Sequence, residues 1–154
     1  LKPNAVTFLP ERSDEITTGS GLDLERNRDT LAKAIRLLKD SGVTVGLFIE
    51  PDVETVKAAH KLDADTVEIN TSGFADLSQE IDRFRMYDRI ELAAKTAHRL
   101  KLVVGAGHGL NYHSVKDIRY IQEIEEYTIG HAIIGRAVMV GMDQAVKEMA
   151  RILR

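Results

Sequence analysis

The sequence predicts an α/β fold in which repeated strand–helix units surround a parallel sheet. Short runs rich in β-branched and aliphatic residues alternate with longer stretches whose apolar residues recur every three or four positions. Most of the short runs are continuously apolar, as expected for strands covered on both faces. The chain has 154 residues, of which 44% are hydrophobic and 29% charged, enough for one globular domain with its own core.

Five segments have the composition of strands, and each is bounded by Gly, Pro, Asn or charged residues. The expected strands are 5–9, 43–49, 65–69, 102–104 and 127–133. The expected helices between and after them are 24–40, 53–62, 76–99, 115–123 and 136–153. In the first helix the spacing of Leu31, Ile35 and Leu38 places one apolar stripe against the sheet. Pro51 suits the first turn of the second helix, where its missing N–H is not needed.

Five such units fit either an open doubly wound sheet or part of a closed eight-stranded barrel, which typically needs about 200–250 residues. The residues alone leave both architectures open. In both, ligands bind where the strands end, and polar residues gather at these positions. They are Glu11, Arg12, Glu50, Glu68, Asn70, Thr71, His108, Gly130 and His131.

Composition excludes several classes of function. The chain has no Cys, so a disulfide framework and thiolate metal sites are excluded. A net charge of −3, from 21 basic and 24 acidic residues, argues against nucleic-acid binding. No run of 18 apolar residues is present, and we expect no export signal. We therefore expect neither a nucleic-acid nor a membrane partner, and a cytoplasmic location.

The segment 105–111 carries three glycines at alternate positions around His108. Glycine permits close backbone approach to a ligand, but the spacing matches neither the dinucleotide-binding fingerprint nor the phosphate loop. An imidazole at a strand end can give or take a proton near neutral pH. We expect His108 to be functional, and the alternative is an exposed histidine in a tight turn.

Two further strand ends carry candidate chemistry. Glu68 has apolar neighbours on both sides, so its carboxylate is expected to point into the interior near the mouth, where burial would raise its pKa. Its alternative role is to pair with an interior base. In the segment 128–136 the last expected strand, which carries Gly130 and His131, leads into the terminal helix, whose first N–H groups suit a phosphate. The alternative there is a glycine needed only for packing.

The remaining candidates are weaker. The hydroxyl-rich and glycine-rich segment 17–23 is typical of a loop that contacts a phosphate or simply caps a helix. Glu11 and Arg12 are expected to pair with each other. His60 and His98 fall in amphipathic helices and receive no role. His108, His113 and His131 match no metal-ligand motif, so no metal is expected.

Taken together, these segments resemble the pyridoxine 5'-phosphate synthase family over the whole chain. The residues that carry the resemblance are 7–12, 17–18, 21–23, 47–49, 67–69, 106–112 and 129–138, the last two being long and specific. The resemblance implies a TIM (βα)8 barrel in which this chain, as a single domain, covers strands four to eight and the N-terminal units are absent. An isolated arc with two unpaired edges is expected to fold poorly and to be inactive.

The resemblance also implies roles for individual residues. The proton-donating histidine of the family corresponds to His108, and its transition-state-stabilising glutamate to Glu68. The phosphate contacts correspond to Gly109, Gly130, His131 and Thr17. Three positions depart from the family pattern: the glutamate of the hydroxyl loop is replaced around Gly19 and Ser20, Asn70 stands where a histidine is frequent, and Gly105 replaces the usual asparagine.

The implied reaction joins 1-deoxy-D-xylulose 5-phosphate to 3-amino-2-oxopropyl phosphate through an imine, releases inorganic phosphate and water, and closes a pyridine ring. It needs no cofactor. The family forms homo-octamers, so a homo-oligomer is expected here.

Two alternatives remain: a non-catalytic phosphate-binding α/β module, and another phosphosugar isomerase or aldolase on the same barrel. A Schiff-base lysine would favour the latter, but Lys101 lies at the start of its strand.

Overall fold

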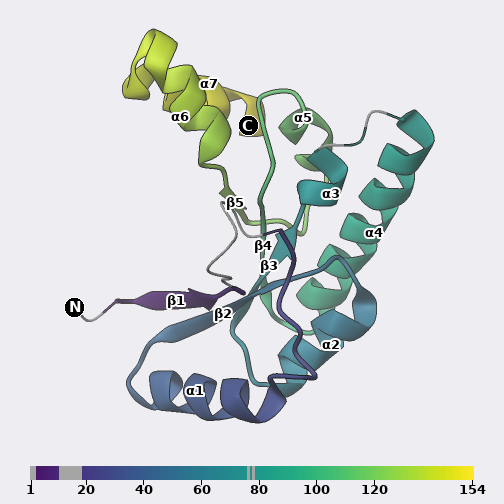
Figure 1. The fold of residues 1–154 in the computed structure, drawn as a ribbon, viewed down its shortest axis with the longest axis vertical. Helices are drawn as coiled ribbons and strands as arrows, with labels where there is room; N and C mark the ends of the chain where they lie inside the picture. Colours follow the sequence, from purple (N-terminus) through teal and green to yellow (C-terminus); the bar gives the residue numbers. More distant parts are fainter. Residues whose placement is uncertain (1–2, 11–18, 76, 78) are drawn as a thin grey trace.

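A single parallel sheet organises the molecule. The computed structural model describes residues 3–10, 19–75, 77 and 79–154. Its five strands are β1 (Ala5–Phe8), β2 (Thr44–Ile49), β3 (Thr66–Asn70), β4 (Val103–Gly107) and β5 (Glu126–Thr128). Each strand pairs in parallel with the next along the chain, so the sheet order is β1-β2-β3-β4-β5 (Figure 1).

This order decides between the two predicted architectures. A doubly wound sheet reverses its strand order at a switch point and has helices on both faces. Here the described strands follow one another without reversal, and their direction turns steadily across the sheet (Figure 1). The geometry therefore fits part of a barrel. The outer strands β1 and β5 each have one neighbour among the described strands.

The helices connect successive strands or follow the last one. They are α1 (Arg28–Asp40), α2 (Val53–Lys61), α3 (Ser72–Ala75), α4 (Glu80–Arg99), α5 (Val115–Ile118), α6 (His131–Val140) and α7 (Met142–Leu153). Asp52 caps α2, because its carboxylate accepts a hydrogen bond of 2.9 Å from the Thr55 amide. Ser41 and Gly42 end α1 as expected, with Gly42 at φ +75°.

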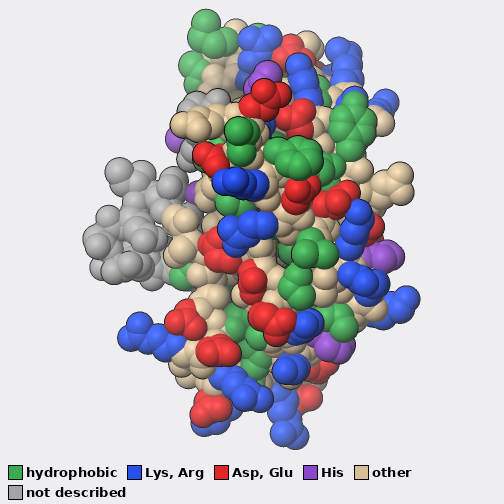
Figure 2. Space-filling model, turned by 90° about the vertical axis from the view of Figure 1, so that its right-hand side faces the viewer, with side chains coloured by type: hydrophobic (Ala, Val, Ile, Leu, Met, Phe, Trp, Pro, Cys, Tyr) green, Lys and Arg blue, Asp and Glu red, His purple; other side chains and the backbone are tan. Residues whose placement is uncertain are grey.

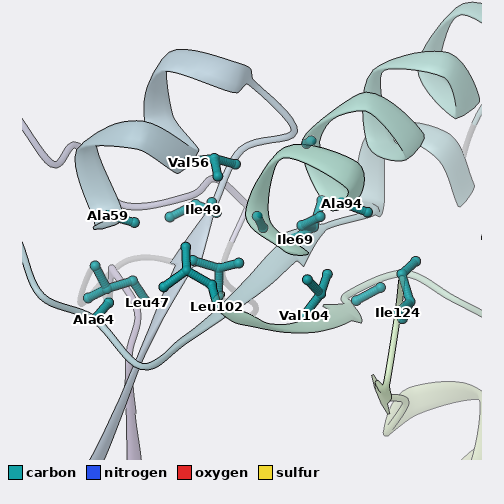
Figure 3. Packing of buried hydrophobic residues seen from close by; sticks show 14 of the residues in the cluster. Leu47, Ile49, Val56, Ala59, Ala64, Ile69, Ala94, Leu102, Val104 and Ile124 are labelled. Atoms are coloured by element: carbon teal, nitrogen blue, oxygen red, sulfur yellow. The ribbon is translucent and has the colours of Figure 1, made fainter. Parts of the chain in front are cut away.

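The core lies between the sheet and helices α1, α2 and α4. Alternate residues of β2 and β3, such as Leu47, Ile49, Val67 and Ile69, are at most 1% exposed on this side. Small residues of the helices let them approach the sheet closely, as Figure 3 shows for Ala59 of α2 and Ala94 of α4. Burial of these aliphatic groups is the main force that holds the helix layer to the sheet.

Acidic and basic side chains cover the outer surface of the helix layer. Figure 2 shows the side on which α4 lies, with the two signs of charge interspersed. Several form ion pairs one helical turn apart, including Lys95 with Glu91 at 2.9 Å. Their long-range fields largely cancel on this side. None of the described helices is long and apolar enough to cross a bilayer.

The C-terminal region differs from the sequence prediction in two ways. The strand expected over 127–133 ends at Thr128, and its last residues open α6. The single helix expected over 136–153 is two helices, because Gly141 adopts φ +83° between them. The apolar pattern predicted the wrong structure here because a short β-branched run such as 129–134 is compatible with either a strand or a helix.

Helix α7 packs against α6 and α5 rather than against the sheet. Ala145 and Met149 are its buried residues. The Tyr112 hydroxyl donates a hydrogen bond of 2.8 Å to the Ala145 carbonyl, and Arg119 donates one of 2.6 Å to the Ile152 carbonyl. These contacts tie the last helix to the segment that follows β4.

Candidate active site

A cavity of about 750 Å³ lies at the carboxyl ends of the strands, on the face of the sheet opposite the helix layer. Every strand contributes to its lining, either directly or through the residue that follows. The lining residues are Thr7, Leu9, Phe48, Glu68, His108, Gly109, Leu110, Asn111, Thr128, Ile129, Gly130, His131 and Ala132. This volume falls within the usual range for small-molecule sites.

Glu68 faces the cavity because strand residues alternate between the two faces of the sheet. Its neighbours Val67 and Ile69 are buried under the helices, whereas Glu68 is half-buried on the cavity side. Burial raises the pKa of the Glu68 carboxyl above its ordinary value, and the Glu126 carboxylate acts in the same direction. The Thr128 hydroxyl and the charge of His108 partly oppose this pKa shift. The raised pKa predicted from the sequence is confirmed in direction.

His108 lies directly after β4, beside Glu68 at the cavity wall. Its ring meets the Phe48 ring edge-on, with 6.2 Å between centroids. The backbone of His108 is left-handed, with φ +73°, and Gly109 follows at φ +76°. A side chain on Gly109 would come within 3.1 Å of Ser72 and Ala75. The glycine after the histidine is therefore required by both backbone conformation and space.

The glycine before the histidine serves a different purpose. Gly107 pairs with Thr128 in the sheet, and a Cβ atom at position 107 would collide with the Glu68 carboxylate and approach the Thr128 Cβ to 2.8 Å. Glycine at this position thus leaves the space that the Glu68 side chain occupies. Of the three alternate glycines recognised in the sequence, Gly107 and Gly109 are a steric requirement of the site, whereas Gly105 has room for a Cβ atom.

Gly130 and His131 lie at the N-terminus of α6, on the rim of the same cavity. The first N–H groups of a ten-residue helix have no partner within the helix and carry partial positive charge. Such a terminus suits a phosphate or carboxylate. Because α6 begins at His131 rather than at residue 136, Gly130 and His131 themselves form the helix start instead of belonging to the strand, as the sequence predicted.

The site is also close to the described end of the loop between β1 and α1. The Gly21 amide donates a hydrogen bond of 2.6 Å to Glu50 Oε1, which also accepts one of 2.9 Å from the Asn70 side chain. The Leu22 amide donates to the Phe48 carbonyl at 2.9 Å. Sequence reasoning placed Glu50 at a strand end and gave it no role. The structure makes it the anchor of this loop.

Comparison with known proteins shows the family to which the chain belongs. The family model described as pyridoxal phosphate biosynthesis protein PdxJ matches residues 1–154. The chain belongs to this family. A protein of Desulforapulum autotrophicum named pyridoxine 5'-phosphate synthase is 46% identical over 154 residues, which are all of this chain and 64% of that protein.

Other relatives carry the same name. The protein of Syntrophotalea carbinolica is 46% identical over 149 residues, covering 97% of this chain and 62% of its own length. The protein of a Geobacter species is 44% identical over the whole chain and 64% of its length. The chain therefore spans somewhat less than two thirds of the length of these PdxJ-family proteins. The resemblance inferred from segments 106–112 and 129–138 is confirmed.

Five of the six predicted site residues share the cavity of this PdxJ-family chain, namely Glu68, His108, Gly109, Gly130 and His131. The sixth, Thr17, lies outside the described residues, as do Glu11 and Arg12. Among the residues that the structure describes, no group of three or more His, Asp or Glu is arranged to hold a metal ion.

Sequence reasoning gave no role to the other eight lining residues, three of which lie within strands, as Glu68 does. Thr7, Phe48 and Thr128 line the cavity without a motif of their own. Their signal was strand alternation: Phe48 pairs with Glu68, and Thr128 pairs with Gly107, so each lies on the face of the sheet that carries the candidate acid. Finding them requires the register of the strands, which local sequence patterns do not specify.

Proposed function

We propose that the protein to which this chain belongs is a pyridoxine 5'-phosphate synthase. The reaction condenses 1-deoxy-D-xylulose 5-phosphate with 3-amino-2-oxopropyl phosphate, releases inorganic phosphate and water, and closes the pyridine ring without a cofactor. One observation carries the proposal: an imidazole and a half-buried carboxylate face one cavity whose rim is a helix N-terminus. The names of the relatives support the same reaction.

The reaction needs groups that move protons around substrates held in reacting geometry. We assign His108 to protonating a leaving oxygen, because an imidazole can act as an acid near neutral pH. Glu68 would stabilise the positive charge that develops on the imine nitrogen, an interaction strengthened by partial burial of the carboxylate. While Glu68 is protonated it can instead relay a proton, so its raised pKa bears on both roles.

The phosphate of one substrate would bind at the N-terminus of α6. Gly130 and His131 are the contacts there, and Gly109 lies across the same cavity at the end of β4. Thr17 completes this proposed set by family resemblance. Two phosphate anchors would fix the separation of the reacting carbonyl and amine, which is the main contribution of binding to such a condensation.

The wider assignment follows the family. We propose that this single domain is the C-terminal part of one TIM barrel, with β1 to β5 corresponding to barrel strands four to eight. One edge of β1 pairs with no other strand in the described part of the chain, and β1 has exposed residues. Both support this numbering, because additional strands would cover them. The homo-octamer and the cytoplasmic location are proposed on the same basis.

The test uses the full-length protein, meaning a chain of the relatives' full length that contains these 154 residues. Both substrates are supplied, and pyridoxine 5'-phosphate is measured for the unchanged protein and for His108→Asn and Glu68→Gln. We expect each variant to lose about 100-fold or more in kcat. His113→Asn changes an exposed histidine in the same segment, outside the cavity lining, and should leave the rate unchanged.

Two results would contradict the proposal in different ways. Unchanged product from both variants would remove the site assignment. Phosphate binding without any product from the unchanged full-length protein would favour the non-catalytic module.

A further inference from the structure

The backbone around His108 adopts an unusual conformation that needs support. Two consecutive residues, His108 and Gly109, are left-handed. Glycine adopts this conformation freely, but a residue with a Cβ atom does so rarely and at a cost in free energy. The surrounding structure must therefore hold His108 in place.

Thr71 provides this support from the neighbouring strand. It follows β3, is fully buried, and lies against the end of β4. Its amide donates a hydrogen bond of 2.8 Å to the Gly107 carbonyl. Its hydroxyl lies 2.8 Å from the same carbonyl and 2.7 Å from the carbonyl of His108. Because the Thr71 amide already donates to the Gly107 carbonyl, the Thr71 hydroxyl can donate its proton to the His108 carbonyl.

These contacts fix the two backbone angles of His108. The Gly107 carbonyl belongs to the peptide plane before the His108 Cα atom, and the His108 carbonyl belongs to the plane after it. Holding both oxygens against one residue fixes the rotation of both planes, and with them φ and ψ of His108. In the part of the chain that the structure describes, no second donor reaches the His108 carbonyl.

The fixed backbone also fixes the direction in which the imidazole leaves the chain. With φ near +73°, the ring lies at the cavity wall against the edge of Phe48. A right-handed backbone at the same position would turn the Cβ atom, and hence the ring, to another direction. The orientation of the proposed proton donor thus depends on a hydroxyl that does not itself line the cavity.

We propose that Thr71 is a positioning residue that sets the orientation of the His108 imidazole for proton transfer. This inference rests on the role of His108 under the proposed function. It assigns no substrate contact to Thr71. It distinguishes the Thr71 hydroxyl from its amide, which joins β3 to β4 whatever the side chain is.

The experiment compares three substitutions in the full-length protein. Thr71→Val keeps the shape and removes the hydroxyl, whereas Thr71→Ser keeps the hydroxyl. Thr96→Val is the matched control, because Thr96 is also buried and its hydroxyl also donates to a backbone carbonyl, that of Leu92 within α4. We expect Thr71→Val to lower kcat about 10- to 100-fold, the cost of a small misplacement of a reacting group. KM should change little, and Thr71→Ser and Thr96→Val should retain the original kcat.

Two further measurements separate positioning from a general structural role. The first is the pH dependence of kcat, in which His108→Asn identifies the limb that depends on His108 by abolishing it. This limb should shift or flatten in Thr71→Val and stay unchanged in Thr96→Val. A crystal structure of Thr71→Val should show the imidazole turned from its original direction. If Thr71→Val does not fold, Thr71→Cys replaces it, since a thiol is a weak donor.

Each outcome has a defined meaning. An unchanged imidazole direction in Thr71→Val or Thr71→Cys, or a kcat equal to that of Thr71→Ser, would overturn the inference. A turned imidazole together with full activity of His108→Asn would leave Thr71 as the residue that orients His108, and would instead remove His108 from the proposed function.

Discussion

The two faces of the sheet are made by the same strands and differ in composition, because the cavity side carries polar residues that the helix side lacks. In β3, Val67 and Ile69 pack under the helices, while Glu68 lines the cavity. On the helix side, aliphatic side chains fill the space completely, with exposures near zero. The cavity side combines glycines and apolar side chains such as Phe48 with polar side chains that border the cavity. The helix side therefore supplies stability, and the cavity side carries the candidate site.

The largest effect is expected on the helix side. Ile69→Ala removes a fully buried side chain between β3 and the helix layer, and should lower the free energy of unfolding by about 2–5 kcal/mol. Chemical denaturation of the full-length protein measures this loss. Leu92→Ala, at an aliphatic position of α4 that is 51% exposed, should change it by less than about 0.5 kcal/mol. If the two substitutions lowered the free energy of unfolding equally, burial against the sheet would not be what makes Ile69 important.

A smaller steric effect is expected on the cavity side. Gly107→Ala places a Cβ atom against Thr128 and Glu68, which should cost about 1–3 kcal/mol and also lower activity by displacing the carboxylate. Gly105→Ala is the matched control on the same strand and face, because its nearest neighbours are 3.7 Å or more from the added atom. If both substitutions are tolerated equally, the space around Glu68 is not limiting.

On the cavity side, the charge of Glu68 should make the free energy of unfolding of the protein depend on pH. Because burial raises its pKa in the folded state above the ordinary value of 4.5, ionisation of Glu68 destabilises the fold. Glu68→Gln should therefore gain stability relative to the unchanged protein as pH rises from 4.5 through the raised pKa, and the two should converge below pH 4.5. Denaturation curves at several pH values measure the difference. A gain that grows toward lower pH would show that the pKa is lowered instead.

The smallest effect is expected away from both faces. Arg136 of α6 and Glu148 of α7 form an exposed ion pair at 2.8 Å, which lowers the pKa of Glu148 to about 2. Its contribution to stability is present above pH 4.5 and lost as pH falls toward 2. Glu148→Gln should reduce stability only slightly, because solvent and salt screen such pairs. A loss comparable to that of Ile69→Ala would mean that α6 and α7 are held mainly by this pair.

The strands and the main helices could be predicted because their information is local. The continuous apolar runs around Leu47 and Val67 predicted β2 and β3, and the three-to-four spacing of Leu31 and Ile35 predicted α1. The prediction was wrong for segment 129–133, where the apolar pattern does not distinguish a strand from the start of a helix. It also missed α3, whose four residues are too few to show a period. The expected poor folding of an isolated arc stays a prediction.

The sequence by itself determined which residues are candidates for the chemistry and which strand or strand end carries Glu68 and His108. Glu68, His108 and Gly130 were identified because a polar or glycine residue at the end of an apolar run is a local pattern. Only the tertiary structure decided that they share one cavity, that Phe48 and Thr128 join them, and that Thr71 holds the backbone of His108. The reason is physical: these relations depend on strand register and sheet order, which arise from contacts between residues far apart in the chain.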